Sequence, residues 1–207
     1  MHRSQAPLET CLAPVFAFKN HTASASQAWE QQDRARASIG NAAGNSLIMS
    51  TMFETRSVSL NDVALVTAHR KAMIESMGGA TEPVIAAVSA NFEPWVTRKI
   101  AEGSYLGWIT EEDGRPVASA GLLILDWPPS PLDPVGEQRG YIFNVFVEPE
   151  YRRRGLARAL VRRCLAEAHS RAIRIVALHA SDAGRALYEE LGFTASDEML
   201  SVRSLGG

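Results

Sequence analysis

The alternation of hydrophobic and polar residues changes character about a quarter of the way along the chain. Residues 1 to 48 are rich in Ala, Ser, Gln and Asn and show no sustained hydrophobic period. A segment that buries little apolar surface does not offset the entropy lost on ordering, so we expect a weakly ordered N-terminal extension there. Residues 49 to 207 carry clear strand and helix patterns, and we expect them to form one folded domain.

The patterned region predicts a succession of strands and helices. Strands are predicted over residues 53–60, 104–110, 116–125, 139–147, 173–180 and 193–203, and helices over residues 62–77, 83–102, 155–170 and 182–191. The pair Asp113-Gly114 favours a tight hairpin between the second and third strands. The strand–helix–strand unit from 140 to 179 requires a parallel crossover. This order predicts an α/β protein with a mixed central sheet flanked by helices.

Composition narrows the class of protein without naming a function. The formal net charge is -2, which gives no overall attraction to nucleic acid or to an anionic membrane. No apolar run approaches the roughly 18 residues of a membrane span, and the short run from Leu12 to Phe18 is interrupted by Pro14. The two cysteines, Cys11 and Cys164, form no C-x-x-C pair, and Cys164 lies in an apolar helical pattern that is typical of a core residue. We therefore expect a cytoplasmic protein that needs no metal.

The clearest chemical signal follows the strand predicted at 139–147, where a turn leads into a helix that starts near Gly155. The N-terminus of a helix presents unpaired backbone N–H groups and the positive end of the helix dipole, a geometry that suits a phosphate or pyrophosphate. Gly155 lets the backbone approach a ligand closely, and Ala157 keeps a neighbouring position small. Residues 152–174 contain eight arginines and one acidic residue, so positive charge is concentrated around this turn.

The same turn resembles a family signature. The run Arg152-x-x-Gly155-x-Ala157 is similar to the Arg/Gln-x-x-Gly-x-Gly/Ala motif of the GNAT family of N-acetyltransferases, and the predicted element order from about 53 to 203 matches the GNAT fold, in which the central strands splay apart. The resemblance implies that acetyl-CoA is the co-substrate, with its pyrophosphate held by the turn and its pantetheine arm lying along the preceding strand. The cofactor-binding residues implied in this way are Val145, Phe146, Val147, Arg152, Arg153, Arg154, Gly155, Leu156, Ala157 and Arg158.

A second segment, from Gly184 to Phe193, resembles the L-Y-x-x-L-G-F ending of a helix in the same family. The resemblance implies that Tyr188 is the catalytic acid that protonates the departing thiolate. The family often has an asparagine seven positions earlier, where this chain has Ser181, and a serine hydroxyl can cap a helix at such a place. Without the family match, Tyr188 also fits a core tyrosine whose hydroxyl is hydrogen-bonded.

The reaction implied is direct attack of a neutral amine on the thioester carbonyl. The amine has to lose a proton to a base or a chain of waters, and the developing oxyanion needs a donor such as a backbone N–H. Candidate bases are Glu93, Asp126, Glu137 and Glu148, which the sequence does not rank. The acceptor is expected to be a small-molecule or peptide amine. The two N-terminal helices are expected to line its site, and the proline-rich loop at 126–138 fits either a connector or a further wall.

Other functions stay open at this point. The arginine-rich helix also suits a nucleic-acid-binding module, although that function would not explain Gly155, Ala157 or the L-Y-x-x-L-G-F segment. A non-catalytic sensor of acyl-CoA with the same fold is a second alternative. His169 and His179 lack partners at metal-ligand spacing, which favours structural or surface roles. His69, on the first predicted helix, fits the acceptor site, although a place in the core or on the surface is favoured. We expect no nucleic-acid or membrane partner, and a homodimer stays open.

Overall fold

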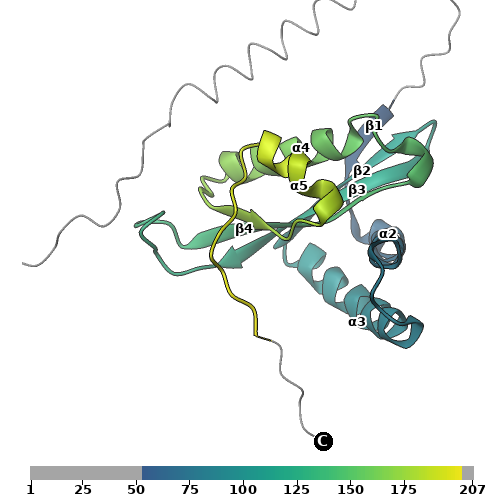
Figure 1. Cartoon of the computed structure of the whole chain (residues 1–207), viewed down its shortest axis with the longest axis horizontal. Coiled ribbons are helices and arrows are strands. Elements are labelled where there is room, and N and C mark those ends of the chain that lie inside the picture. Colours follow the sequence, from purple (N-terminus) through teal and green to yellow (C-terminus); the bar gives the residue numbers. More distant parts are fainter. Residues whose placement is uncertain (1–52, 202–207) are drawn as a thin grey trace, which may run out of the picture. The chain divides into compact units, whose positions relative to one another are not determined.

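The computed structural model describes residues 53–201 of the chain (Figure 1). The extension predicted at 1–48 and the end of the strand predicted at 193–203 lie outside this range and stay predictions. Within it, helices and strands follow the predicted order through the last helix. Their bounds are β1 (Phe53–Ser57), η1 (Leu60–Asp62), α2 (Val63–Met77), α3 (Glu82–Ala101), β2 (Tyr105–Glu112), β3 (Arg115–Asp126), β4 (Gln138–Val147), η2 (Pro149–Tyr151), α4 (Leu156–Ser170), β5 (Val176–Leu178) and α5 (Asp182–Glu190).

The strands of residues 53–201 form one sheet in the order β1-β2-β3-β4-β5. The first four strands pair antiparallel, and β4 and β5 run parallel, as the connection through α4 requires. In the hairpin between β2 and β3, Asp113 and Gly114 have φ values of 51° and 78°, and two successive positive φ values are what a type I′ turn needs. The prediction of an α/β fold with a mixed sheet flanked by helices is therefore confirmed.

Helices cover both faces of the sheet (Figure 1). Helix α4 buries its apolar stripe on one face, while α2 and α3 pack on the other. The core beneath α4 includes Ala118, Ala120, Leu122, Ile142, Leu160 and Val161. The core beneath α2 and α3 includes Val63, Val66, Phe92, Val96 and Tyr105. The sheet is thus the middle layer of three, a standard way to bury both of its faces.

Strand β4 bends at Asn144, and this bend opens the sheet. Asn144 is buried and has φ 54°, a left-handed conformation that asparagine adopts more readily than most residues. The register to β3 shifts there, because Gly121 pairs with Phe143 but Ser119 pairs with Phe146, which leaves one extra residue on β4. Strand β5 pairs only with residues 140–142 of β4. From residue 143 to 147, the edge of β4 that faces away from β3 has no strand partner among the described residues.

The strand predicted at 193–203 is wrong for its described part, because residues 193–201 form no strand. Phe193 packs against the core, but residues 194–201 are exposed, and Met199 and Leu200 almost fully so. An apolar alternation specifies a strand only where one side of it can be buried. The segment is tied to β4 by an ion pair of 2.5 Å between Glu198 and Arg139.

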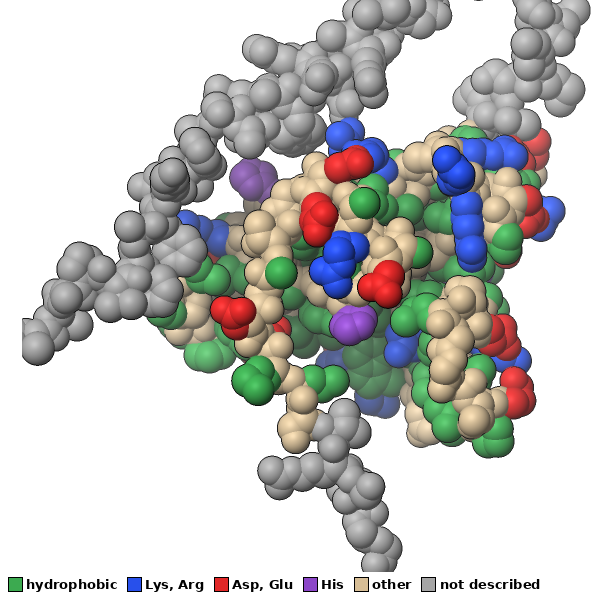
Figure 2. Space-filling view, viewed as in Figure 1, with side chains coloured by type: hydrophobic (Ala, Val, Ile, Leu, Met, Phe, Trp, Pro, Cys, Tyr) green, Lys and Arg blue, Asp and Glu red, His purple; other side chains and the backbone are tan. Residues whose placement is uncertain are grey.

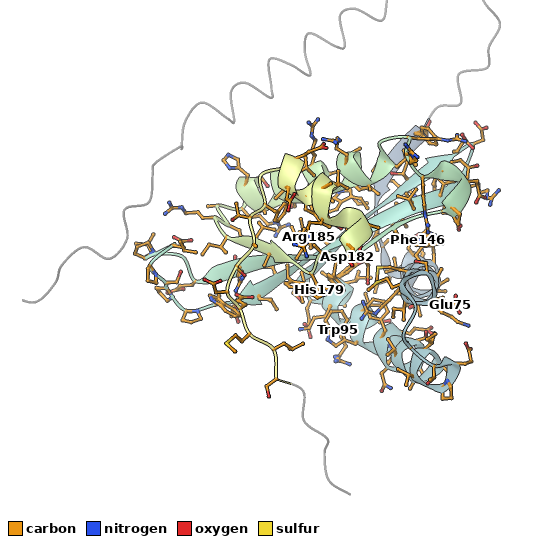
Figure 3. The ribbon with its side chains drawn as sticks, viewed as in Figure 1. Glu75, Trp95, Phe146, His179, Asp182 and Arg185 are labelled. Carbon is orange, nitrogen blue, oxygen red and sulfur yellow. The ribbon has the colours of Figure 1, made fainter. Side chains whose placement is uncertain are left out.

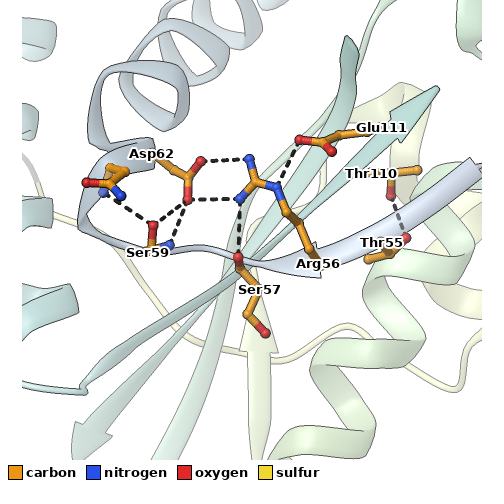
Figure 4. Close-up of polar contacts among 8 residues, drawn as sticks. Thr55, Arg56, Ser57, Ser59, Asp62, Thr110 and Glu111 are labelled. Atoms are coloured by element: carbon orange, nitrogen blue, oxygen red, sulfur yellow. Dashed lines mark hydrogen bonds and ion pairs between the residues drawn. The ribbon is translucent and has the colours of Figure 1, made fainter. Parts of the chain in front are cut away.

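The corner between β1 and α2 is held by a closed polar network (Figure 4). Arg56 donates two hydrogen bonds to the carboxylate of Asp62, at 2.8 and 3.0 Å, and a third to Glu111 at 2.9 Å. The backbone N–H and the hydroxyl of Ser59 also donate to Asp62, at 2.8 and 2.9 Å. The hydrogen bonds from Arg56 hold the pKa of the Asp62 carboxyl down to about 2.

Candidate functional site

The turn between β4 and α4 has the backbone that the sequence predicted. Gly155 lies just before α4 with φ 84° and ψ 0°, and no atom lies within 4 Å of the position that a Cβ would occupy there. Arg153 is also left-handed, with φ 64°. The backbone N–H groups of residues 153–158 have no hydrogen-bond acceptor among residues 53–201. Six neighbouring donors at the positive end of a 15-residue helix suit an anion such as a pyrophosphate.

Three of the four arginines at this turn are engaged by the protein itself. Arg152 donates through Nε to the carbonyl oxygen of Val147 at 3.1 Å. Arg154 donates to the carbonyl oxygen of Glu150 and lies 4.9 Å from the centre of the Tyr151 ring. Arg158 forms an ion pair with Glu190 of α5.

Arg153, by contrast, makes no ion pair with any residue in the range 53–201. The side chains therefore leave less free positive charge than the count of arginines in the sequence suggests. The backbone donors are the more prominent feature of the turn.

The unpaired edge of β4 leads directly into this turn. Val145, Phe146 and Val147, the residues implied to lie along pantetheine, make up the last part of the edge that has no partner strand. Phe146 is buried and stacks at 4.8 Å on His69 of α2, whose Nδ1 lies 2.8 Å from the hydroxyl of Ser119. Burial lowers the pKa of His69, so the ring is neutral at neutral pH. His69 therefore has the structural role that the sequence favoured.

Tyr188 lies on α5 and packs against the same buried cluster as Val145 and Val147. Its ring meets Phe193 edge-on, with centroids 6.0 Å apart. Gly184 makes room for this ring, because a Cβ there would lie 2.9 Å from Cε2 of Tyr188. The Tyr188 hydroxyl has no hydrogen-bond partner within residues 53–201, and burial raises its pKa. A half-buried phenol that keeps its proton and has no partner in the chain can act as a proton donor.

Ser181 directly precedes α5, but its side chain makes no capping hydrogen bond. The capping role suggested for this hydroxyl is therefore wrong. Instead, the carbonyl oxygen of Ser181 accepts from the N–H groups of Gly184 and Arg185, each at 3.0 Å.

Side chains from α3, β4, α5 and the segment after β5 border the region beyond the point where the pairing of β4 with β5 ends (Figure 3). His179 follows β5, and Asp182 and Arg185 belong to the first turns of α5. In this view, Trp95 of α3 and Phe146 of β4 border the same region from the other elements. The space-filling view shows the surface recessed between α5 and the helices α2 and α3 (Figure 2).

On the α2 side of this region, the sequence reasoning missed a pair of polar residues. Arg70 donates through Nη1 to Oδ1 of Asn144 at 2.6 Å, and its guanidinium lies 4.8 Å from the centre of the Phe92 ring. A signal was present in the sequence, because Asn144 is the one polar residue in the run YIFNVFV. A polar side chain in a buried strand has to find a partner, and 74 residues separate this one from Arg70.

The candidate bases lie apart from one another. Glu93 is exposed on α3, and Glu148 follows the end of β4, where its N–H pairs with Val117. Asp126 and Glu137 border a cavity of about 1030 Å³ beneath the loop between β3 and β4. That loop joins the end of β4 opposite the turn at 152–158, which favours its interpretation as a connector.

Neither thiol chemistry nor a metal is indicated by the described residues. Cys164 is buried, and burial raises the pKa of its thiol to about 12, which leaves it a core residue. In the range 53–201, no three His, Cys, Asp or Glu side chains gather in a way that could hold a metal ion. No helix in that range has both the length and the apolar character to cross a membrane.

Comparison with known proteins agrees with this geometry. Residues 74–193 match the model of the acetyltransferase (GNAT) family. A GCN5-related N-acetyltransferase from Ralstonia eutropha is 38% identical, with a TM-score of 0.71 over 73% of this chain and 99% of that one. A predicted acetyltransferase from Clostridium acetobutylicum, solved with acetyl-CoA, is 28% identical, with a TM-score of 0.68 over 73% of this chain and 96% of that one.

Human N-acetyltransferase 8 is 34% identical over 89 residues, which make up 42% of this chain and 37% of the human protein. The match therefore spans less than half the length of that relative. The family model, by contrast, covers more than half of this chain and includes the turn at 152–158, α5 and Tyr188. The chain belongs to the acetyltransferase (GNAT) family.

Proposed function

We propose that this protein is an N-acetyltransferase that moves the acetyl group of acetyl-CoA to a primary amine of a small molecule or peptide. The observation that carries the proposal is the continuity of two unsatisfied features. The open edge of β4, residues 143–147, is followed after η2 by six N–H groups, those of residues 153–158, that have no acceptor among the described residues. An extended ligand with an amide-containing arm and a pyrophosphate matches both features in one direction.

Acetyl-CoA fits these residues by its chemistry. The amides of Arg153, Arg154, Gly155, Leu156, Ala157 and Arg158 would hold the pyrophosphate, with positive charge from Arg152 and Arg153 nearby. The backbone of Val145, Phe146 and Val147 would pair with the amides of the pantetheine arm as a neighbouring strand would. The thioester would then lie near the bend of β4, beside the recess between α5 and the helices α2 and α3.

The transfer itself needs three groups. The amine nitrogen forms a bond to the carbonyl carbon while the carbon–sulfur bond breaks, and the amine proton leaves through water or a base. A backbone N–H at the bend of β4 would stabilise charge on the carbonyl oxygen. Tyr188 would give its proton to the departing thiolate. Because burial raises the pKa of Tyr188, this proton is in place at neutral pH.

Release of free CoA thiol from acetyl-CoA in the presence of a panel of primary amines tests the proposal. We expect release that depends on the amine and yields the acetylated product by mass spectrometry. Acetyl-CoA should also raise the melting temperature, because a ligand that binds only the folded state stabilises it. Binding without turnover on any amine would favour a sensor. Salt-dependent DNA binding without any effect of acetyl-CoA would favour a nucleic-acid-binding module.

We expect a cytoplasmic location without a membrane or nucleic-acid partner. A homodimer is compatible with the proposal, which requires no second copy.

A further inference from the structure

Arg70 carries a positive charge to the bend of β4 without a negative partner. Its Nη1 donates to Asn144, its Nε is buried without an acceptor among residues 53–201, and it forms no ion pair in that range. Burial lowers its pKa, yet an arginine stays charged in neutral water. A half-buried charge without a counter-ion destabilises the protein in the absence of a ligand. Such a charge is therefore a candidate for binding a ligand of opposite charge.

The position of this charge relates it to the reaction. Asn144 is the residue at which β4 bends, and Val145, the next residue, belongs to the unpaired edge. The Nδ2 of Asn144 is also buried without a well-aligned acceptor among the described residues. The Tyr105 hydroxyl lies close to both Asn144 and Arg70, but burial raises its pKa, so it supplies no negative charge there. Two sets of N–H donors, joined by one hydrogen bond of 2.6 Å, therefore meet beside the place proposed for the thioester. The Nε of Arg70 and the Nδ2 of Asn144 each lack a hydrogen-bond acceptor among the described residues.

The surroundings of Arg70 and Asn144 limit which chemical group of a ligand could accept their hydrogen bonds. The nearest cation in sequence, Lys71, is already held by Glu75 at 3.6 Å and Glu82 at 3.8 Å. A single guanidinium with one amide suits one negative charge, and a guanidinium binds the two oxygens of a carboxylate with its fork of N–H groups. The phosphates of CoA are proposed at the N-terminus of α4, which packs on the opposite face of the sheet from α2.

We propose that Arg70, with Asn144, binds a carboxylate of the acceptor, so that the natural acceptors are small amino acids or similar amines with a carboxylate a few bonds from the nitrogen. This inference rests on the acetyl transfer proposed above and names its substrate class. Because the thioester is proposed to lie beside the bend of β4 at Asn144, the carboxylate and the amine of the acceptor have to be close together. Phe92 and Trp95, whose rings lie 5.6 Å apart, would provide an apolar wall beside the guanidinium.

The test uses sets of amines that differ only in the acidic group: an amino acid, its amide and its decarboxylated amine, with phosphoethanolamine and ethanolamine as a phosphate pair. We expect the parent protein to prefer the amino acids. In Arg70→Gln, kcat/KM for the amino acids should fall about 30-fold or more, mainly through KM, as expected when one partner of a desolvated charge pair is removed. The decarboxylated amines should change little. Lys71→Gln is the matched control, because it removes the same charge from an exposed ion pair one residue away.

A second variant keeps the inference testable if Arg70→Gln does not fold. Asn144→Asp has nearly the same shape, tolerates the left-handed backbone and gives Arg70 a carboxylate inside the protein. It should keep or raise the melting temperature and abolish the preference for amino acids. A parent protein that prefers decarboxylated amines, or an Arg70→Gln variant that slows all amines equally, would overturn the inference while leaving acetyl transfer intact. A preference for phosphoethanolamine over the amino acids would also overturn it.

If no amine supports CoA release, the proposed function fails and the amino acids become binding probes. A rise in melting temperature with amino acids, absent with their decarboxylated amines and lost in Arg70→Gln, would retain the anion site. Equal shifts in melting temperature in the parent and in Arg70→Gln, or no shift in either, would overturn the proposed anion site.

Discussion

Two arginines, one on β1 and one on α2, differ in how their charges are compensated. Arg56, in the corner between β1 and α2, donates to two carboxylates, and Asp62 is in turn held by Ser59 (Figure 4). Arg70, two turns along α2, is more buried, and its neighbours among residues 53–201 are neutral: the oxygen of Asn144, the face of Phe92 and the hydroxyl of Tyr105. The more buried charge is the one left without a carboxylate.

The difference separates groups with partners inside the fold from groups that we propose to bind a ligand. In the Arg56 corner, the guanidinium of Arg56 and the carboxylate of Asp62 have hydrogen-bond partners among the described residues, and these contacts stabilise the folded state. At the bend of β4, the Nε of Arg70 and the Nδ2 of Asn144 have no acceptor among the described residues. The same holds for the backbone N–H groups of residues 153–158 at the start of α4 and for the hydroxyl of Tyr188. Changes in the first region should therefore alter stability, and changes in the second should alter activity.

The largest effect is expected for Tyr188→Phe, which removes a hydroxyl that has no hydrogen-bond partner within residues 53–201. If Tyr188 protonates the thiolate, the rate of acetyl transfer in a single turnover should fall by about 100-fold, within the usual range for a general acid. The melting temperature should change little, because no hydrogen bond within the described residues is lost. Transfer at the parent rate would make Tyr188 a packing residue and assign the proton to water or another group.

A smaller effect on cofactor affinity is expected for Gly155→Ala, and a control separates strain from binding. Gly155 and Gly103 both have positive φ, 84° and 72°, with open space at the Cβ position. Alanine in a left-handed conformation destabilises by roughly 1–2 kcal/mol at either site. Calorimetric titration with acetyl-CoA should show an affinity about tenfold weaker only in Gly155→Ala, since one methyl group there would meet the pyrophosphate in its proposed place. Equal affinity in both variants would move the pyrophosphate elsewhere.

The smallest effect is expected for Asp62→Asn, and it should appear in stability alone. The folded carboxyl has a pKa of about 2 against an ordinary value of 3.8, so the native state gains stability above pH 4 and loses it as the pH falls toward 2. Because Arg56 is 44% exposed, screening reduces the gain to about 1 kcal/mol.

Urea unfolding of the parent and of Asp62→Asn at a series of pH values measures this gain. The two curves should differ at pH 6 and converge near pH 2, while acetyl transfer at neutral pH stays unchanged. A difference that is constant from pH 6 to pH 2 would show that the charge of Asp62 contributes nothing.

Local patterns in the sequence determined much of this protein. The order of helices and strands, the hairpin at Asp113 and Gly114 and the turn at Gly155 follow from side-chain period and backbone preference, which act over a few residues. The motifs at 152–157 and 187–193 indicated the family for the same reason, since each is contiguous. The prediction of a strand at 193–201 was wrong because a local pattern carries no information on whether another part of the fold covers the segment.

Tertiary structure decided which charges are satisfied. The sequence shows a cluster of arginines after β4, but only the fold brings Glu190 to Arg158 and Glu112 near Arg154. Only the fold limits β5 to three residues, which leaves the edge of β4 open. The pairing of Arg70 with Asn144 joins residues 74 positions apart, and no local period constrains such a contact. Side-chain partners across a sheet depend on strand register and on helix packing, so only the tertiary structure determines which residues meet at the site.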